Sequence, residues 1–424
     1  MLLGWRRLFP PPPSLGMGAR AGKSVFSGKW RPKTRSHARC FLVPARWEAL
    51  LWGMLRSLHF QGYRSLRDFR MKLGKVTVVT GENGVGKSNV YRALEMVQRM
   101  AQGRFAAAVA GEGGLPSMLW AGDLKKNEKR RVAWTVEHMD FHLEMECGMI
   151  PATPGDPSLF KTDPDIKCEE LRHGGAKGRV MAARKGPAIE LRHADGRMSA
   201  LPLPVHATES LLSEVRNSAA FPAVSAARET ILAWRFFDHF PTHPGAPIRQ
   251  PTVGFWSPEL DSDGGNLAAN LQTLVESRKS EPLDEIFQKA FPDCSWSAAD
   301  EMGFQLKLLR PGLKRWLDAS ELSEGTLRFF CLCAALLSLK PAPLMVFNEP
   351  ESSLHRDLLE PLAELIARAS QDSQILIVTH STGLAELIAG KCGAKRIDLI
   401  NHEGKTMDRN DLSESGGKVW NFGD

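Results

Sequence analysis

The sequence lacks any long hydrophobic run. A helix that spans a bilayer needs about 18 or more apolar residues in succession, and the apolar stretch Ala49–Leu55 is far shorter. The seven cysteines are scattered and form no Cys-x-x-Cys pair, so we expect no structural zinc site. Their irregular spacing is typical of a reducing cytoplasm. Neither an internal repeat nor a long heptad pattern is present, which argues against a coiled-coil arm.

Acidic residues are nearly absent from residues 1–53, which contain ten Lys and Arg residues and a single acid, Glu48. This segment carries +9 and the whole chain +7, so the remainder carries −2 and overall basicity is weak support for nucleic-acid binding. Residues 1–53 are rich in Pro, Gly and Arg without an apolar period, and we expect them to be disordered. A basic nucleic-acid arm, an organelle-type presequence and translation from an upstream start all explain them. The last is favoured, with Met54 as the working first residue.

Regular patterns begin at Met54. Alternating polar and apolar residues predict a strand over Leu55–Phe60, and a β-branched run predicts a buried strand over Lys75–Gly81. A helix should follow, because apolar residues recur at helical spacing until Gly103. Residues 104–128 are expected to form a long loop. Residues 130–205 predict antiparallel strands with a loose insert at 151–187 and a turn at Asp195-Gly196.

The rest of the chain favours helices and then an alternation of helix and strand. Helices are predicted over 209–217 and 225–240, followed by a proline-rich link at 241–251 and a helix around Leu267–Leu274. A hairpin with Pro311-Gly312 at its bend precedes a helix, a strand, a helix, a strand and a short helix. This alternation predicts an α/β fold with a mixed or parallel sheet core and an antiparallel β subdomain.

The segment "GENGVGKSN", Gly81–Asn89, matches the P-loop pattern and lies between a predicted strand and a predicted helix. Glycines allow backbone N–H groups to surround phosphates, and the helix start attracts the same anions. Lys87 should reach the β- and γ-phosphates, and Ser88 should bind Mg²⁺. With these flanks, a chance glycine turn is the weaker explanation.

Further motifs follow in the last third of the chain. "LMVFNEPESSLH" places Asn348 and Glu349 at the end of a predicted strand, where an acid can deprotonate water. "ELSEGTLRFF" places Ser323 and Gly325 just before a helix, which suits anion binding, although an imperfect capping box also explains the serine. "ILIVTHS" places His380 at the end of the next strand.

These motifs, in this order, resemble those of an ABC-type ATPase head. Their residue sequences are similar to those of the RecF/SMC-like group, which is related to the OLD family. "FQGYRSL", "DGGNLAANL" and "LSEGTLRFF" support that branch over about Met54–Ile388. The resemblance implies an ATPase domain over 54–424, with a P-loop lobe (54–128), a β and helical insert (129–250) and a signature and catalytic-glutamate lobe (251–424). It also implies ATP and Mg²⁺ as cofactors and an ATP-dependent homodimer.

The resemblance assigns roles to individual residues. Glu349 would be the general base, His380 would sense the γ-phosphate, and Lys87 would serve catalysis. Ser88 and Asn348 would hold Mg²⁺, and Ser352 and Ser353 would cross the dimer interface. Nucleotide contacts are implied for Gly81, Glu82, Asn83, Gly84, Val85, Gly86, Lys87, Ser88, Asn89 and Arg64 in one copy and for Ser323 and Gly325 of the other.

Asn348 departs from the resemblance, since many relatives have Asp or Glu there, and we expect weaker metal affinity rather than inactivity. The favoured function is a DNA-associated ATPase of repair, recombination or anti-phage defence, with a nuclease or effector partner in trans and no membrane partner. Only 44 residues follow His380, too few for the nuclease domain of OLD-type relatives. A transporter ATPase subunit and a nucleotide-gated scaffold with little turnover remain as alternatives.

Overall fold

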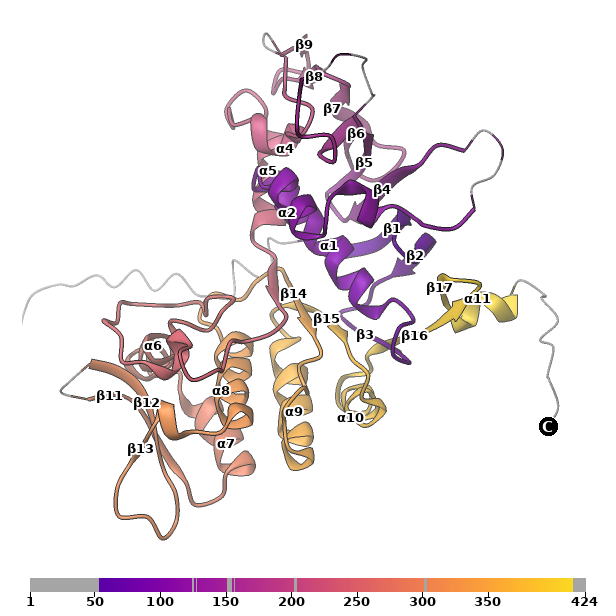
Figure 1. Cartoon of the computed structure of the whole chain (residues 1–424). Coiled ribbons are helices and arrows are strands. Elements are labelled where there is room, and N and C mark those ends of the chain that lie inside the picture. The colour runs from indigo at the N-terminus through magenta and orange to yellow at the C-terminus, as the bar shows by residue number, and fades with distance from the viewer. Residues whose placement is uncertain are drawn as a thin grey trace, which may run out of the picture. The chain divides into compact units, whose positions relative to one another are not determined.

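The computed structural model describes residues 53–414, apart from 124, 125, 127, 151–154, 156, 202, 203, 301 and 302. The predicted extension 1–53 therefore lies outside the described residues, except for Gly53. The described part contains three sheets and the helices packed on them (Figure 1). The α/β fold with an antiparallel β part, expected from the sequence, is confirmed.

A six-stranded sheet carries the P-loop and the other strand-end motifs. Its strand order is β10-β14-β15-β3-β16-β17, and every neighbouring pair is parallel except β16 with β17. The central strands are buried along almost their whole length, because helices or a second sheet cover both faces. The strand bounds are β3 (Val76–Gly81), β10 (Arg235–Phe237), β14 (Leu344–Asn348), β15 (Gln374–Val378), β16 (Lys395–His402) and β17 (Lys405–Asp408).

An eight-stranded antiparallel sheet has the order β2-β1-β4-β5-β6-β7-β8-β9. Along β4, buried residues alternate with partly exposed ones, as in a strand with one covered face. The bounds are β1 (Leu55–Tyr63), β2 (Leu66–Lys72), β4 (Arg131–His138), β5 (Phe141–Met149), β6 (Pro164–His173), β7 (Arg179–Lys185), β8 (Ala188–Arg192) and β9 (Met198–Ala200). A small third sheet consists of β11 (Ser295–Asp300), β12 (Gly303–Leu309) and β13 (Leu317–Asp318).

Helix α1 (Lys87–Ala101) lies between the two large sheets, because its apolar face joins the same core as Trp134 of β4 and Val346 of β14. The opposite face of the six-stranded sheet is covered by helices, of which α8, α9 and α10 lie side by side (Figure 1). The remaining helix bounds are α2 (Phe105–Gly111), α3 (Leu115–Met118), α4 (Leu211–Glu214), α5 (Pro222–Leu232), α6 (Leu267–Glu276), α7 (Glu281–Ala290), α8 (Glu324–Leu336), α9 (Leu359–Ala369), α10 (Thr382–Cys392) and α11 (Arg409–Glu414).

A buried glutamine ties the two large sheets together. Gln374, at the start of β15, accepts a hydrogen bond from Leu55 N (2.9 Å) and donates to Leu55 O (2.8 Å) and Gly74 O (2.9 Å). Its amide thus pairs with backbone groups at the start of β1 and just before β3. This bond set fixes the start of β1 against the start of β15.

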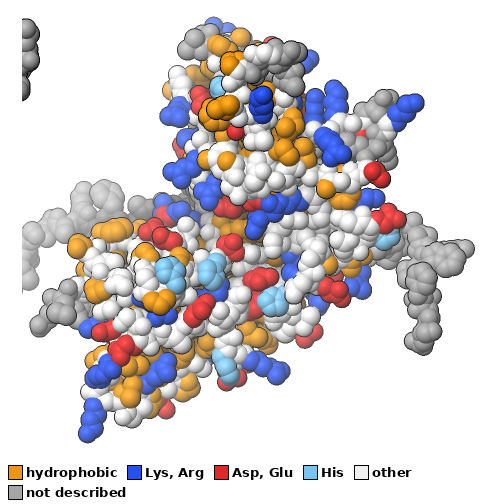
Figure 2. Space-filling model, in the orientation of Figure 1, with side chains coloured by type: hydrophobic (Ala, Val, Ile, Leu, Met, Phe, Trp, Pro, Cys, Tyr) orange, Lys and Arg blue, Asp and Glu red, His pale blue; other side chains and the backbone are white. Residues whose placement is uncertain are grey.

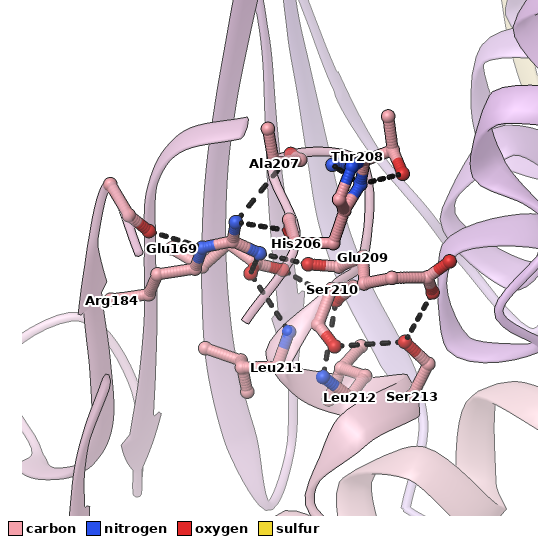
Figure 3. A network of polar contacts seen from close by, with 11 residues as sticks. Glu169, Arg184, His206, Ala207, Thr208, Glu209, Ser210, Leu211, Leu212 and Ser213 are labelled. Atoms are coloured by element: carbon pink, nitrogen blue, oxygen red, sulfur yellow. Dashed lines mark hydrogen bonds and ion pairs between the residues drawn. The ribbon is translucent and has the colours of Figure 1, made fainter. Parts of the chain in front are cut away.

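A buried ion pair organises the far end of the antiparallel sheet (Figure 3). Glu169 of β6 and Arg184 of β7 have fully buried side chains, and their closest charged atoms are 3.3 Å apart. The Glu169 carboxylate accepts from Ser210 Oγ (2.5 Å) and Leu211 N (2.9 Å), so it holds the first turn of α4. The guanidinium donates to four backbone carbonyls, those of Gly186, His206, Ala207 and Glu209.

Three segments differ from the sequence-based expectation. The loop predicted over 104–128 contains α2 and α3, and the loose insert predicted over 151–187 contains β6 and β7. The helix predicted over 225–240 ends at Leu232 and is followed by the short strand β10. Helical periodicity concealed β10, because a three-residue strand is too short to show a period of its own. No helix within the described residues combines the length and the apolarity that a bilayer crossing requires.

Candidate functional site

The P-loop joins the end of β3 to the start of α1, as the sequence predicted. Gly84 (φ 80°) and Gly86 (φ 101°) both adopt the left-handed backbone conformation that favours glycine. No side chain caps the first turn of α1, which begins directly after Gly86. A Cβ atom added at Gly84 would meet no atom within 4 Å, so the loop faces open space there. The loop thus offers uncapped N–H groups at a helix start, an arrangement suited to phosphate.

Lys87 is enclosed by the loop itself, and the residue is only 5% exposed. Its Nζ donates to Gly81 O and Glu82 O, each at 2.8 Å. Burial lowers the pKa of Lys87, whereas the negative charges of Glu349 and Glu351 raise it. The ammonium group therefore lies inside the arc of the P-loop and within electrostatic range of both carboxylates. Phosphate oxygens that enter this arc would replace the two carbonyl acceptors.

Two hydroxyl groups from distant parts of the chain support the P-loop, and sequence reasoning missed both. Ser65, in the turn between β1 and β2, bonds to Thr406 of β17 through their hydroxyls (2.7 Å) and accepts from Asn89 Nδ2 (2.8 Å). Thr406 Oγ1 in turn donates to Val85 O at 2.7 Å. These bonds hold the second half of the loop in place. Without a structure, nothing in the sequence relates positions 65 and 406.

The Gly86→Ala substitution should destabilise the protein beyond the ordinary cost of a strained backbone. An alanine Cβ would lie 2.1 Å from Thr406 Oγ1 and 2.6 Å from Ser65 Oγ. Left-handed strain costs about 1–3 kcal/mol, and displacement of the supporting hydroxyls adds to it. Urea denaturation measures the loss. Gly312→Ala is the matched control, since Gly312 has φ 82° but an added Cβ meets no atom within 4 Å. An equal loss in the two variants would contradict the proposed clash.

Asn348 and Glu349 lie where β14 ends, at the same edge of the sheet as the P-loop, because β14, β15 and β3 run parallel. Glu349 has φ 47°, an uncommon conformation for a residue other than glycine. Its N–H donates to Val378 O of β15 at 2.7 Å, which anchors the bend. The strained backbone therefore turns the Glu349 side chain away from the strand direction.

His380 follows β15 and meets two carboxylates. Its Nδ1 lies 3.5 Å from Glu349 Oε1 and 3.4 Å from Glu351 Oε1, and its side chain is 47% exposed. Glu351 is buried and accepts from Thr379 Oγ1 (2.5 Å) and His380 N (3.2 Å). Glu351 thus positions the His380 segment beside Glu349. It was not among the predicted site residues, although a second acid two positions after Glu349 was a visible signal.

Asp238, at the end of β10, is a further neighbour that the sequence-based account missed. Asn348 Nδ2 donates to Asp238 Oδ1 at 2.7 Å. The second polar atom of the same amide, Asn348 Oδ1, is buried and has no hydrogen-bond partner. The predicted helix over 225–240 hid Asp238, because that helix would have given the residue no strand end to follow.

The signature segment and the loop after β14 contact each other. Ser323 caps α8 by accepting from Thr326 N (3.3 Å), and its side chain lies at the surface at the start of a 13-residue helix. A Cβ on Gly325 would lie 2.5 Å from Ser353 O. Ser353 Oγ also donates to Glu324 Oε1 at 3.0 Å. The predicted interface residues Ser323, Gly325 and Ser353 therefore form one surface.

Arg64 is held by an acid rather than left free for phosphate. Its guanidinium pairs with Glu112 and lies 5.9 Å from the centre of the Tyr63 ring. Arg64 has φ 46° in the turn that also presents Ser65 to the P-loop. A nucleotide contact by Arg64 stays a prediction, and it requires the side chain to exchange Glu112 for a phosphate.

Sequence and fold together define a class. A P-loop on β3, a carboxylate after β14 and a histidine after β15 meet at one edge of a parallel sheet, and an antiparallel sheet packs on α1. A family model described as "AAA domain, putative AbiEii toxin, Type IV TA system" matches residues 206–386. The chain is therefore similar to ABC-type ATPase heads of the RecF/SMC-like group.

Among curated proteins, the chain is similar to the chromosome partition protein Smc of Clostridium kluyveri (strain NBRC 12016). The two are 26% identical over 121 residues, which is 27% of this chain and 10% of that protein. The chain thus spans about a tenth of the length of this relative.

Three solved structures are similar as well. One is an SmcHead bound to the C-winged helix domain of ScpA (17% identity, TM-score 0.47, 84% of this chain and 97% of that chain). Another is an Smc head domain with an extended coiled coil bound to the C-terminal domain of ScpA, derived from Pyrococcus furiosus (15%, 0.47, 86% and 98%). The third is an SMC head domain from Thermotoga maritima (15%, 0.38, 84% and 97%).

Proposed function

We propose that this chain binds and hydrolyses ATP with Mg²⁺. The observation that carries the proposal is the meeting of Lys87, Glu349 and His380 at one sheet edge. The P-loop amides and the Lys87 ammonium bind the phosphates, and Glu349 accepts a proton from the attacking water. His380 contacts Glu349 through Nδ1 and Oε1, and its partly exposed ring would sense the γ-phosphate.

Ser88 and Asn348 are the proposed magnesium-holding residues. Ser88 is exposed at the start of α1, and Asn348 Oδ1 is a buried oxygen without a hydrogen-bond partner. Ser88 Oγ and Asn348 Oδ1 can therefore each coordinate a cation or accept a hydrogen bond from its bound water. The described residues contain no group of three or more His, Cys, Asp or Glu side chains in metal-binding geometry. Mg²⁺ needs no group of that size, because it is usually held by one or two carboxylates together with substrate phosphates and water. When bound, it neutralises charge on the transferred phosphoryl group.

The proposed cycle involves two copies of the chain. Each copy's Ser323 and Gly325 cap the ATP held by the other copy's P-loop, and the contacting loop at Ser352–Ser353 lies beside them. ATP binding closes the pair and hydrolysis opens it. The exposed hydroxyl of Ser323 at the start of a long helix supports this role, since helix starts attract phosphate.

The proposed target of the cycle is DNA, in repair, recombination or anti-phage defence, with a nuclease or effector supplied by a separate chain. Figure 2 shows Lys and Arg side chains at many points over the β4–β9 part of the visible face, with fewer acidic side chains among them. The cytoplasm is the proposed location, because the described cysteines are unpaired thiols. A nucleotide-gated scaffold is the second candidate, favoured by the neutral Asn348 at the metal site.

ATP turnover by the full chain tests these proposals. Hydrolysis is measured with and without single- and double-stranded DNA, and Lys87→Ala sets the background rate. We expect turnover above that background and a further increase with DNA. A wild-type rate equal to that of Lys87→Ala would refute the ATPase, and turnover that DNA leaves unchanged would refute the DNA-linked role alone.

A further inference from the structure

The site has an unusual distribution of charge. Magnesium prefers hard oxygen ligands and is normally held through at least one carboxylate. The residue that ends β14 is the neutral Asn348, and the carboxylate that follows it, Glu349, is the proposed base. A carboxylate for the cation must therefore come from another element if the site follows the usual chemistry of magnesium.

The neighbouring strand brings a carboxylate to this point. Strands β10 and β14 are parallel with Phe237 opposite Phe347, so the next residues, Asp238 and Asn348, lie side by side where these strands end. The hydrogen bond of 2.7 Å between them determines how the amide is oriented. The reverse orientation would place the amide oxygen against a carboxylate oxygen, which is repulsive. Asn348 Oδ1 is consequently the atom left free, buried and without a partner.

Asp238 is exposed and lines a polar pocket of about 520 Å³ between α1 and the loop that contains Asp261. Tyr91, one turn after Ser88 on α1, lines the same pocket. Burial above all, and then the charges of Glu95 and Asp238, raise the pKa of Tyr91. Asp238 therefore lies within electrostatic range of the first turns of the helix that carries Ser88.

We infer that Asp238 supplies the negative charge of the magnesium site in place of residue 348, with the Asn348 amide as the link between them. Asp238 accepts a hydrogen bond from Asn348 Nδ2 and thereby orients the amide. Asn348 Oδ1 is then the atom that coordinates the cation or accepts a hydrogen bond from its water. The carboxylate of the site would thus lie at the end of β10, one strand away from the end of β14, where the resemblance places it. This inference rests on the proposed function, because it assigns a residue to the same site.

Isosteric exchange of the two residues tests the assignment in the full chain. The variants are Asp238→Asn, Asn348→Asp and the double exchange, which restores one carboxylate and one amide in swapped positions. Mn²⁺ affinity in the presence of ATP is read by electron paramagnetic resonance, and binding of a fluorescent ATP analogue is measured in EDTA. We expect Asp238→Asn to weaken Mn²⁺ binding about 10–100-fold, with nucleotide binding in EDTA unchanged, and the double exchange to recover most of the loss.

Asp261→Asn is the matched control, since Asp261 lines the same pocket but forms no hydrogen bond with the Asn348 amide, and it should keep wild-type Mn²⁺ affinity. Asp238 also lies near the buried Arg328, where burial lowers the pKa of the guanidinium and the charges of Glu324 and Asp238 raise it. If Asp238 only neutralises Arg328, Asp238→Asn will lower stability in urea without changing Mn²⁺ affinity, and the inference is overturned. An unrecovered double exchange overturns it too. A wild-type chain that binds no nucleotide, even in EDTA, refutes the proposed function itself.

Discussion

Glu349→Gln is expected to lower ATP turnover by about 10²–10⁴-fold while ATP remains bound, because the amide keeps the size of the side chain but cannot accept a proton from water. Glu349 is the carboxylate that the strained turn after β14 directs toward His380, at 3.5 Å. Binding should survive, since the P-loop and Lys87 are untouched. Closure without hydrolysis should then trap a dimer, which light scattering detects as a doubled mass in the presence of ATP and Mg²⁺.

Glu360→Gln is a suitable control, because Glu360 is an exposed carboxylate at the start of α9. It should hydrolyse ATP at the wild-type rate and show no trapped dimer. Hydrolysis by Glu349→Gln at the wild-type rate would show that another group is the base, and Glu351 would be the next candidate. Slow hydrolysis without dimer formation would separate the two parts of the proposal, with the base retained and the closure rejected.

Glu169→Ala should lower the free energy of unfolding by about 3–5 kcal/mol, the largest stability loss we expect from a single substitution here. The change leaves the Arg184 guanidinium buried without its counter-charge, a loss of this size in other buried pairs. It also removes the acceptor for Ser210 Oγ and Leu211 N, so the first turn of α4 loses its anchor (Figure 3). Urea denaturation followed by circular dichroism measures the difference.

The comparison for this variant is Asp195→Ala. Asp195 pairs with Arg197 at 2.7 Å, but both side chains are more than half exposed, so solvent screens the pair. Exposed pairs contribute about 0–1 kcal/mol. A loss below about 1 kcal/mol in Glu169→Ala would mean that Arg184 is sufficiently stabilised by the four carbonyls that it contacts.

Much of this site follows from local sequence because its parts are strand ends. A β-branched run followed by a glycine-rich loop predicts β3 and the P-loop, and an apolar run followed by "NEPESSLH" predicts β14 and Glu349. The periodicities of 2 and 3.6 that identify such elements need several residues to be visible. The central strands and α1 meet this condition, and their prediction is confirmed.

The site residues that the sequence did not predict share a different property. Their positions depend on pairing with segments that are far away in the sequence. Strand β10 has three residues and is a strand only because β14 lies beside it, so Asp238 could not be assigned. Strands β16 and β17 carry acids that suggest a solvated surface, yet Asp398 of β16 accepts a hydrogen bond from Thr80 of β3. In these segments, pairing between strands therefore overrides the structure that the local sequence favours.

The support of the P-loop by Thr406 has a consequence for synthesis of the chain. The Val85–Thr406 hydrogen bond joins residues 321 positions apart, and β3 pairs with β15 and β16, both from the final part of the chain. At translation rates of about 5–20 residues per second, the ribosome works for roughly 15–65 s between the two. For most of that interval the emerging P-loop has neither neighbouring strand, so a nascent chain that stalls before β15 should be unable to retain nucleotide and should be a natural client for chaperones.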